Sequence, residues 1–332
     1  MQFKSRAVRL IATLAAVLVP LALSNSATAA EWPERPITIV IGFGVGGSAD
    51  RTTRAVASFL PEEIGQPILT VNRQGAGGQL AASYVLGAPD DGYTLLGTAL
   101  SPYLGTSILV GGAQYEMEDF AFINAQWTDW DLIAVNKDSP FKTLPELIKA
   151  IEAEPKKHSV SLVFGSSGHL TTLLLLDEFG IPRENLNLVN YDSGAAARSA
   201  VAGGQVTFTI LGAEGSEGVR DFIRPLAVVR EDANEMWDAP PINEALAPTG
   251  VRIPVVLGSM RGLVAPATFK QKHPERFDKL VAAYKAVLDR KDVQKYLARS
   301  GVGGEWLGPE KTTKQVMEMY AVFEKYKDLL KQ

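Results

Sequence analysis

Three glycine-rich turns that join a strand to a helix constrain the fold of this 332-residue chain more than any other feature. Strands are expected at 37–41, 68–71 and 160–164, and they are followed by the turns 42–48, 75–78 and 165–168. Residues 37–41 form a continuous β-branched run, which indicates a parallel strand covered on both faces. Repeated strand, turn and helix predict an α/β fold with doubly wound, Rossmann-like sheets.

A second series of strands and helices begins near residue 132. Thr143 and Glu146 have capping-box spacing, with a proline inside the first helical turn. The proline-rich stretch 239–254 interrupts the pattern before the chain ends in charged helices. Length and pattern together predict two domains, one formed by 31–131 with 256–332 and the other by 132–255.

The first 29 residues have the organisation of a secretory signal peptide. Three basic residues precede an apolar stretch at 10–23, and Ala27-Thr28-Ala29 matches an A-x-A cleavage signal. Fourteen residues interrupted by Pro20 are short for a membrane anchor, which needs about 20. Because an exported chain without cysteine suits a bacterial envelope, we expect a periplasmic protein.

Composition and motif details exclude several classes of function. A formal net charge of -4 argues against nucleic-acid binding, and three histidines without ligand spacing argue against a metal site. Gly42, Gly44 and Gly47 match G-x-G-x-x-G, which leaves a nucleotide-dependent oxidoreductase as a competitor. However, the second strand ends in Asn72-Arg73 without the acidic residue that holds a ribose. We therefore predict no catalytic residues, no cofactor and no metal.

The glycine turns are better explained by anion binding. A helix N-terminus presents unpaired backbone N–H groups and a partial positive charge, and glycine lets an anion approach closely. Ser48 in the first half, and Ser166 with Ser167 in the second, can add hydroxyl groups. The alternative is that these glycines only let a helix pack tightly on its sheet.

Four ordered segments carry a resemblance to a known family: 32–37 (WPERPI), 46–50 (GGSAD), 72–78 (NRQGAGG) and 88–96 (APDDGYTLL). Weaker matches continue at 165–169, 190–191, 203–206 and 226–228. The chain resembles the solute receptors of tripartite tricarboxylate transporters, also called Bug or TctC-like proteins. The resemblance implies a type II periplasmic-binding-protein architecture with a hinge and an interdomain cleft. It also implies a small organic carboxylate as ligand and an integral membrane permease as partner, and we expect a monomer.

The same resemblance assigns the carboxylate site to the turns of both domains. The positions implied are Gly46, Gly47 and Ser48 in one domain, and Ser166, Ser167 and Gly168 in the other. We add the adjacent Val45 and His169 to the predicted ligand-binding residues. The sequence departs from the family at 43–45, where a Pro-containing segment is usual, and at Thr207, where Asp is common.

Four further residues complete the predicted ligand-binding set: Thr98, Trp127, Tyr191 and Asp192. Trp127 either stacks on the ligand or packs beneath the hinge, and His169 either lines the pocket or is structural. The predicted mechanism is binding without chemistry, in which the ligand favours a closed form. An envelope sensor that signals to a protein partner remains the alternative to a transport receptor.

Overall fold

A computed structural model describes residues 31–331, and residues from Pro33 onward form one compact unit. The predicted signal peptide, residues 1–29, lies outside the described residues. No helix within 31–331 combines the length and apolar character needed to cross a membrane.

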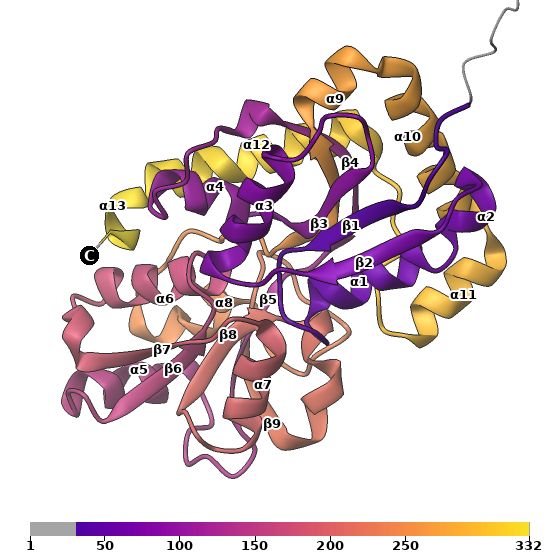
Figure 1. Cartoon of the computed structure of the whole chain (residues 1–332). Helices are drawn as coiled ribbons and strands as arrows, with labels where there is room; N and C mark the ends of the chain where they lie inside the picture. The colour runs from indigo at the N-terminus through magenta and orange to yellow at the C-terminus, as the bar shows by residue number, and fades with distance from the viewer. Residues whose placement is uncertain (1–30, 332) are drawn as a thin grey trace, which may run out of the picture. The chain divides into compact units, whose positions relative to one another are not determined.

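The first of two five-stranded sheets has the order β2-β1-β3-β10-β4 (Figure 1). Its strands are β1 (Ile37–Ile41), β2 (Ile68–Asn72), β3 (Thr94–Ser101), β4 (Phe120–Thr128) and β10 (Met260–Pro266). As predicted, β1 is an interior strand that pairs in parallel with both β2 and β3. Only β10 runs antiparallel to its neighbours.

Helices cover both faces of this sheet because side chains alternate between the faces along each strand. Val40, Leu96 and Val264 share one core cluster with residues of α3 (Gln79–Leu86), α4 (Tyr103–Leu109) and α12 (Gly308–Lys325). Helix α1 (Ser48–Ala57) also contacts the sheet, and α2 (Leu60–Ile64) contacts α10. The other helices that follow β10 in the chain are α9 (Ala267–Lys272), α10 (Pro274–Asp289), α11 (Lys291–Arg299) and α13 (Lys327–Leu330).

The second sheet repeats this arrangement with the order β7-β6-β8-β5-β9. Its strands are β5 (Asp131–Asn136), β6 (His158–Leu162), β7 (Leu186–Asn190), β8 (Phe208–Gly212) and β9 (Ile223–Val229). Strand β5 alone runs antiparallel to its neighbours. The predicted α/β class with two sheets is confirmed, and each sheet is mixed because one strand enters directly from the other half.

The second sheet is also covered on both faces. One core includes Ile133, Val160 and Ile210, and packs against α5 (Leu144–Ala153), α6 (Ser167–Glu178) and α8 (Ile242–Ala245). The other core includes Leu132, Ala134 and Val228, and packs against α7 (Gly194–Ala202). The capping box predicted at Thr143 and Glu146 is confirmed at the start of α5.

The chain passes between the two halves twice, through Asp129–Trp130 and through residues 230–259. We call the part built on the first sheet the first half, and the part built on the second sheet the second half. The C-terminal helices contact both, since α12 packs on β4 and α13 packs on α6. The predicted boundary at 255/256 falls in the second passage, whereas the one at 131/132 falls just inside β5. The division into two domains stays a prediction.

Candidate functional site

The N-termini of three helices, α1, α6 and α7, meet at a cavity of about 30 Å³ between the two halves. A volume of this size accommodates a group of only a few heavy atoms. The lining residues that come from these helix starts are Gly47, Ser48, Ala49, Ser166, Ser167, Ser193 and Gly194. The first N–H groups of a helix have no partner inside the helix, so three sets of donors lie around one small space.

The turn before α1 is organised by Asp50. Its carboxylate accepts hydrogen bonds from Gly46 N at 3.0 Å, Arg54 Nε at 2.8 Å and Asn72 Nδ2 at 2.8 Å. Gly46 has φ +79°, a conformation that favours glycine. Asp50 is 3% exposed and occupied by these donors, so it holds the loop in shape.

Ser48 has a different role from the one its position suggested. Gly47 is the N-cap of α1, and Ser48 is the first helical residue without a capping bond. A serine at the end of the glycine turn predicts an N-cap at Ser48, and this prediction is wrong. Its hydroxyl instead accepts a hydrogen bond from Arg261 Nε at 2.7 Å, which joins α1 to β10 beside the cavity.

Ser166 is the N-cap of α6, and its hydroxyl accepts a hydrogen bond from His169 N at 3.0 Å. Ser166 and Ser167 both line the cavity. Gly168 does not, and a Cβ atom there would overlap the carbonyl oxygen of Ile210. Packing of α6 against β8 thus explains Gly168.

The third helix start, that of α7, was not predicted as part of the site. Ser193 is its N-cap and accepts a hydrogen bond from Ala196 N. Ser193 and Gly194 line the cavity, whereas the predicted Tyr191 and Asp192 do not. The ligand contacts predicted for Tyr191 and Asp192 stay predictions.

Arg198 is the most informative residue of the site. It is 6% exposed, lies on α7 and lines the cavity. Its Nε donates to Ser216 Oγ at 3.0 Å and its Nη2 donates to the carbonyl of Gly212 at 3.1 Å. Its Nη1 donates no hydrogen bond to any residue in 31–331. The guanidinium also forms no ion pair within 4.0 Å with any of these residues. Burial lowers the pKa of Arg198 to about 10, so it stays charged at neutral pH.

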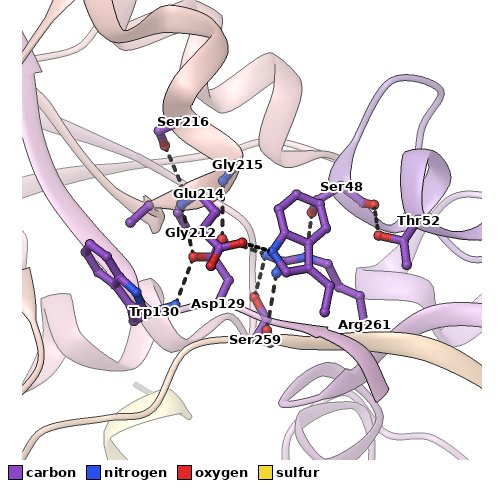
Figure 2. A network of polar contacts seen from close by, with 12 residues as sticks. Ser48, Thr52, Asp129, Trp130, Gly212, Glu214, Gly215, Ser216, Ser259 and Arg261 are labelled. Carbon is purple, nitrogen blue, oxygen red and sulfur yellow. Dashed lines mark hydrogen bonds and ion pairs between the residues drawn. The ribbon is translucent and has the colours of Figure 1, made fainter. Parts of the chain in front are cut away.

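Arg261, a second buried arginine at the cavity, is fully engaged by the protein (Figure 2). Besides Ser48, it donates to Ser259 O at 3.2 Å and to Ser259 Oγ at 3.1 Å. It also forms an ion pair of 3.5 Å with Asp129 Oδ2. Asp129 accepts backbone hydrogen bonds from Trp130, Glu214 and Gly215 as well. This network fixes the passage between the halves.

Asp131, the first residue of β5, adds an acidic group to the lining. It is 2% exposed, and its Oδ2 has no hydrogen-bond partner within the described chain. Burial raises the pKa of Asp131 to about 6, although a hydrogen bond with Ser167 and the nearby Arg261 and Arg198 oppose the shift.

An apolar cluster closes the space around these polar groups. Phe43, Ala99 and Tyr103 come from the first half, and Val163, Ala197 and Leu211 come from the second. The rings of Phe43 and Tyr103 meet edge to face with centroids 4.9 Å apart. Since the two halves pack against each other here, a ligand larger than the cavity can enter only when they separate.

The remaining predicted residues lie around the site but do not line it. Val45 is 75% exposed, and Thr98 is buried behind Gly42 and Gly78. His169 is buried and its Nδ1 accepts a hydrogen bond from Gly165 N at 3.2 Å. Burial, the main cause, and the nearby Arg183 lower the pKa of His169 to about 4, so the ring is neutral. The ligand contacts predicted for Val45, Gly46, Thr98 and His169 stay predictions.

Trp127 is also buried away from the cavity. Its Nε1 donates to Glu214 across the two halves, and the guanidinium of Arg261 lies 4.8 Å from its ring centroid. This arrangement favours packing beneath the hinge over direct stacking on a ligand. Trp130 lines a separate groove with Arg230, Leu257 and Met260.

The site offers binding groups and little for catalysis. Among residues 31–331, no three His, Asp or Glu side chains are grouped to hold a metal ion. The serine hydroxyls of the lining lack a histidine base, because His169 is committed to Gly165.

Sequence reasoning missed Arg198 and Arg261. A recognisable signal was present, since Arg198 lies in the small-residue stretch 194–202 and Arg261 in the apolar strand 260–266. A single charge in an otherwise buried element requires a compensating partner or ligand.

Comparisons with known proteins found a matching family and similar chains. A family model described as "Tripartite tricarboxylate transporter family receptor" matches residues 52–326. The UPF0065 protein in the gbd 5' region of Cupriavidus necator is 30% identical over 293 residues, covering 87% of this chain and 85% of that protein.

Two solved structures from Rhodopseudomonas palustris are also similar. A protein solved with adipate has a TM-score of 0.74 and 27% identity, and the match covers 90% of this chain and 98% of that one. MatC, with bound malate, has a TM-score of 0.77 and 25% identity, with coverage of 90% and 100%.

Proposed function

This chain belongs to the tripartite tricarboxylate transporter receptor family, and from that premise we propose that it is a periplasmic receptor for a small organic carboxylate. Membership in a family of receptors confirms the prediction that it binds rather than catalyses. The adipate and malate held by the two similar structures support a carboxylate ligand for this chain as well.

The observation that carries the proposal is the state of Arg198. A buried guanidinium is costly unless an anion compensates it, and Arg198 has no carboxylate partner within ion-pair distance among residues 31–331. Its unbonded Nη1 belongs to a group that lines the cavity, where three helix N-termini also converge. A ligand carboxylate placed there would accept charge-assisted hydrogen bonds from both kinds of donor.

Binding would be coupled to closure. The donors belong to both halves, so a carboxylate gains all of them only when the halves approach. Such a ligand stabilises the closed form more than the open form and shifts the population toward it. The closed form then becomes the signal for a membrane permease.

The proposed location and partner follow from the same family. We expect export with cleavage after Ala29, so that N-terminal sequencing of the periplasmic protein should begin at Ala30. A protein that stays in the cytoplasm would contradict this.

Delivery to a tripartite-type permease can be tested by measuring carboxylate uptake in cells that lack the receptor. Purified protein added back to spheroplasts of these cells should restore the uptake.

Titration calorimetry with a panel of mono- and dicarboxylates tests the binding function. At least one should bind wild-type protein in the micromolar range, which corresponds to about -8 kcal/mol. Arg198→Met keeps much of the side-chain volume and removes the charge, and should weaken that binding by at least thirtyfold. Circular dichroism and thermal unfolding report whether the variant is folded.

The matched control is Arg220→Met, because Arg220 belongs to the same half but is exposed and bonded to Glu217 and Met236. It should bind the ligand like the wild type. Equal affinity in the folded Arg198→Met variant, or no binding of any carboxylate to wild-type protein, would contradict the proposal.

A further inference from the structure

Asp131 is a buried acid that the carboxylate-binding role does not use. A negative side chain at the site of a receptor for anions does not help binding, because it repels the negative charge of the ligand. Yet Asp131 lies in the same cavity lining as Arg198, Arg261 and Ser167. Its presence therefore requires an explanation in terms of the ligand.

The position of Asp131 in the second sheet directs it to the site. It begins β5 between Gly212 of β8 and Val229 of β9, and Gly212 also lines the cavity. A hydrogen bond with Ser167 lowers the pKa of the Asp131 carboxyl against the larger effect of burial. Its Oδ2 is buried and has no partner within residues 31–331.

The neighbouring charges do not satisfy this oxygen. Arg261 pairs with Asp129 at 3.5 Å, and no ion pair within 4.0 Å links Asp131 to either arginine in the described chain. A buried acceptor without a partner costs free energy that a correctly placed donor recovers. Asp131 lines the same small cavity as Arg198, so a ligand donor that reaches the Asp131 carboxylate must lie close to the carboxylate that Arg198 binds.

We infer that Asp131 is a specificity-determining residue that accepts a hydrogen bond from a hydroxyl or ammonium group on the ligand, close to its carboxylate. The inference rests on the proposed carboxylate function and narrows it to hydroxy- or aminocarboxylates. A ligand without such a donor leaves Oδ2 unpaired, and one that places a second carboxylate there is repelled. Selection against an analogue that lacks the donor can be strong for this reason.

Succinate, malate and aspartate form a matched set of probes, because they share a four-carbon dicarboxylate skeleton and differ only at C2. Glutarate, 2-hydroxyglutarate and glutamate repeat the comparison with one more carbon. In calorimetry on dialysed wild-type protein, the hydroxy or amino member of at least one set should bind at least tenfold more tightly than the unsubstituted member. Tighter binding of the amino member identifies an ammonium donor, and tighter binding of the hydroxy member identifies a hydroxyl.

Two substitutions separate charge from hydrogen bonding. Asp131→Asn keeps an acceptor oxygen and removes the charge. It should therefore weaken binding of the amino ligand at least tenfold and binding of the hydroxy ligand less than threefold. Asp131→Leu removes both the acceptor oxygen and the charge. In this variant the affinities for the unsubstituted and substituted ligands should lie within threefold of each other. Asp138→Asn, an exposed aspartate beyond the other end of β5, is the control and should keep wild-type selectivity.

The outcomes separate this inference from the function on which it rests. If carboxylates bind but the unsubstituted member of each set binds as well as the others, the inference is wrong and the receptor function stands. Selectivity that persists in a folded Asp131→Leu variant also contradicts it. Should a variant fail to fold, the wild-type comparison still decides the question. Failure of every carboxylate to bind would remove the receptor function and the inference together.

Discussion

Single polar residues at the cavity hold the structure as much as they face a ligand. Ser48 supports Arg261, Ser166 caps α6, and His169 accepts from the Gly165 backbone. Each side chain therefore has a partner within the protein, whereas Nη1 of Arg198 and Oδ2 of Asp131 have none among residues 31–331. The candidates for direct ligand contact are thus the residues that the protein leaves incompletely bonded.

Removal of either serine hydroxyl should weaken carboxylate binding. We expect Ser48→Ala and Ser166→Ala each to cost about 1 to 2 kcal/mol in binding free energy, because each removes one hydroxyl donor from a site whose ligand is a charged acceptor. Calorimetry measures the effect. Ser58→Ala, at the exposed end of α1, serves as the control. Wild-type affinity in both variants would show that these hydroxyls do not support the site.

Buried His169 should make the protein less stable in acid. Its pKa is lowered from 6.5 to about 4, so between these values the unfolded chain binds a proton that the folded chain rejects. Its contribution to the free energy of unfolding should fall by about 3 kcal/mol as pH decreases from 6.5 to 4. Urea unfolding of wild type and His169→Gln across this range isolates the contribution as a difference in pH dependence. Parallel curves would mean that His169 protonates normally in the folded state.

Asp131 should make the protein less stable as the pH rises, which is the opposite of the effect of His169. Because its pKa is raised from 3.8 to about 6, the folded chain binds the proton more tightly, and stability is lost as pH rises between these values. Asp131→Asn should therefore gain about 2 to 3 kcal/mol relative to wild type from pH 4 to pH 7. The same unfolding experiment measures this gain. A constant difference between the two proteins would contradict an unfavourable charge at neutral pH.

At the scale of the elements, the start of α6 at the site depends on close packing behind it. Gly168 lets α6 approach β8 so closely that a methyl group would overlap Ile210 O. Gly168→Ala should therefore lower the free energy of unfolding by more than about 3 kcal/mol, since backbone atoms cannot yield as side chains do. Gly218→Ala has open space around the added methyl and is the matched control. Similar melting temperatures for both variants would contradict this account of α6.

Several elements could be predicted from local pattern, and others could not. Strand β1 and the start of α5 follow from a β-branched run and a capping box. Strand β4 lacks a comparable pattern because Asn124 and Gln126 interrupt its apolar residues. Both are fully buried, and their amides donate to carbonyls of residues 305 and 303, nearly 180 positions away. Local pattern cannot predict partners supplied by so distant a segment.

At the scale of the whole molecule, contact between the halves depends on Gly165, which comes from the second half. It has φ +74°, and a Cβ atom there would overlap Thr106 Oγ1 of the first half. Gly165→Ala should hold the halves apart, weaken carboxylate binding at least tenfold and enlarge the radius of gyration with ligand present, as measured by small-angle scattering.

Two comparisons separate the overlap between the halves from the effect of backbone strain at Gly165. Gly180→Ala carries a similar φ of +63° in open space, and should lose stability without losing affinity. Adding Thr106→Ala to Gly165→Ala should restore part of the binding. Equal losses of affinity at both glycines would show that strain, and not contact between the halves, is responsible.

The sequence by itself determined the α/β class, the family, and the glycine turns at 46–48 and 166–168, because each depends on residues that are neighbours along the chain. Only the tertiary structure decided which residues line the cavity. Arg198, Arg261 and Asp131 are more than 60 positions apart in sequence, and folding places all three in its lining. The charges of Arg198 and Asp131 acquire a role only from burial and from the partners they lack, and neither property exists before the two halves meet.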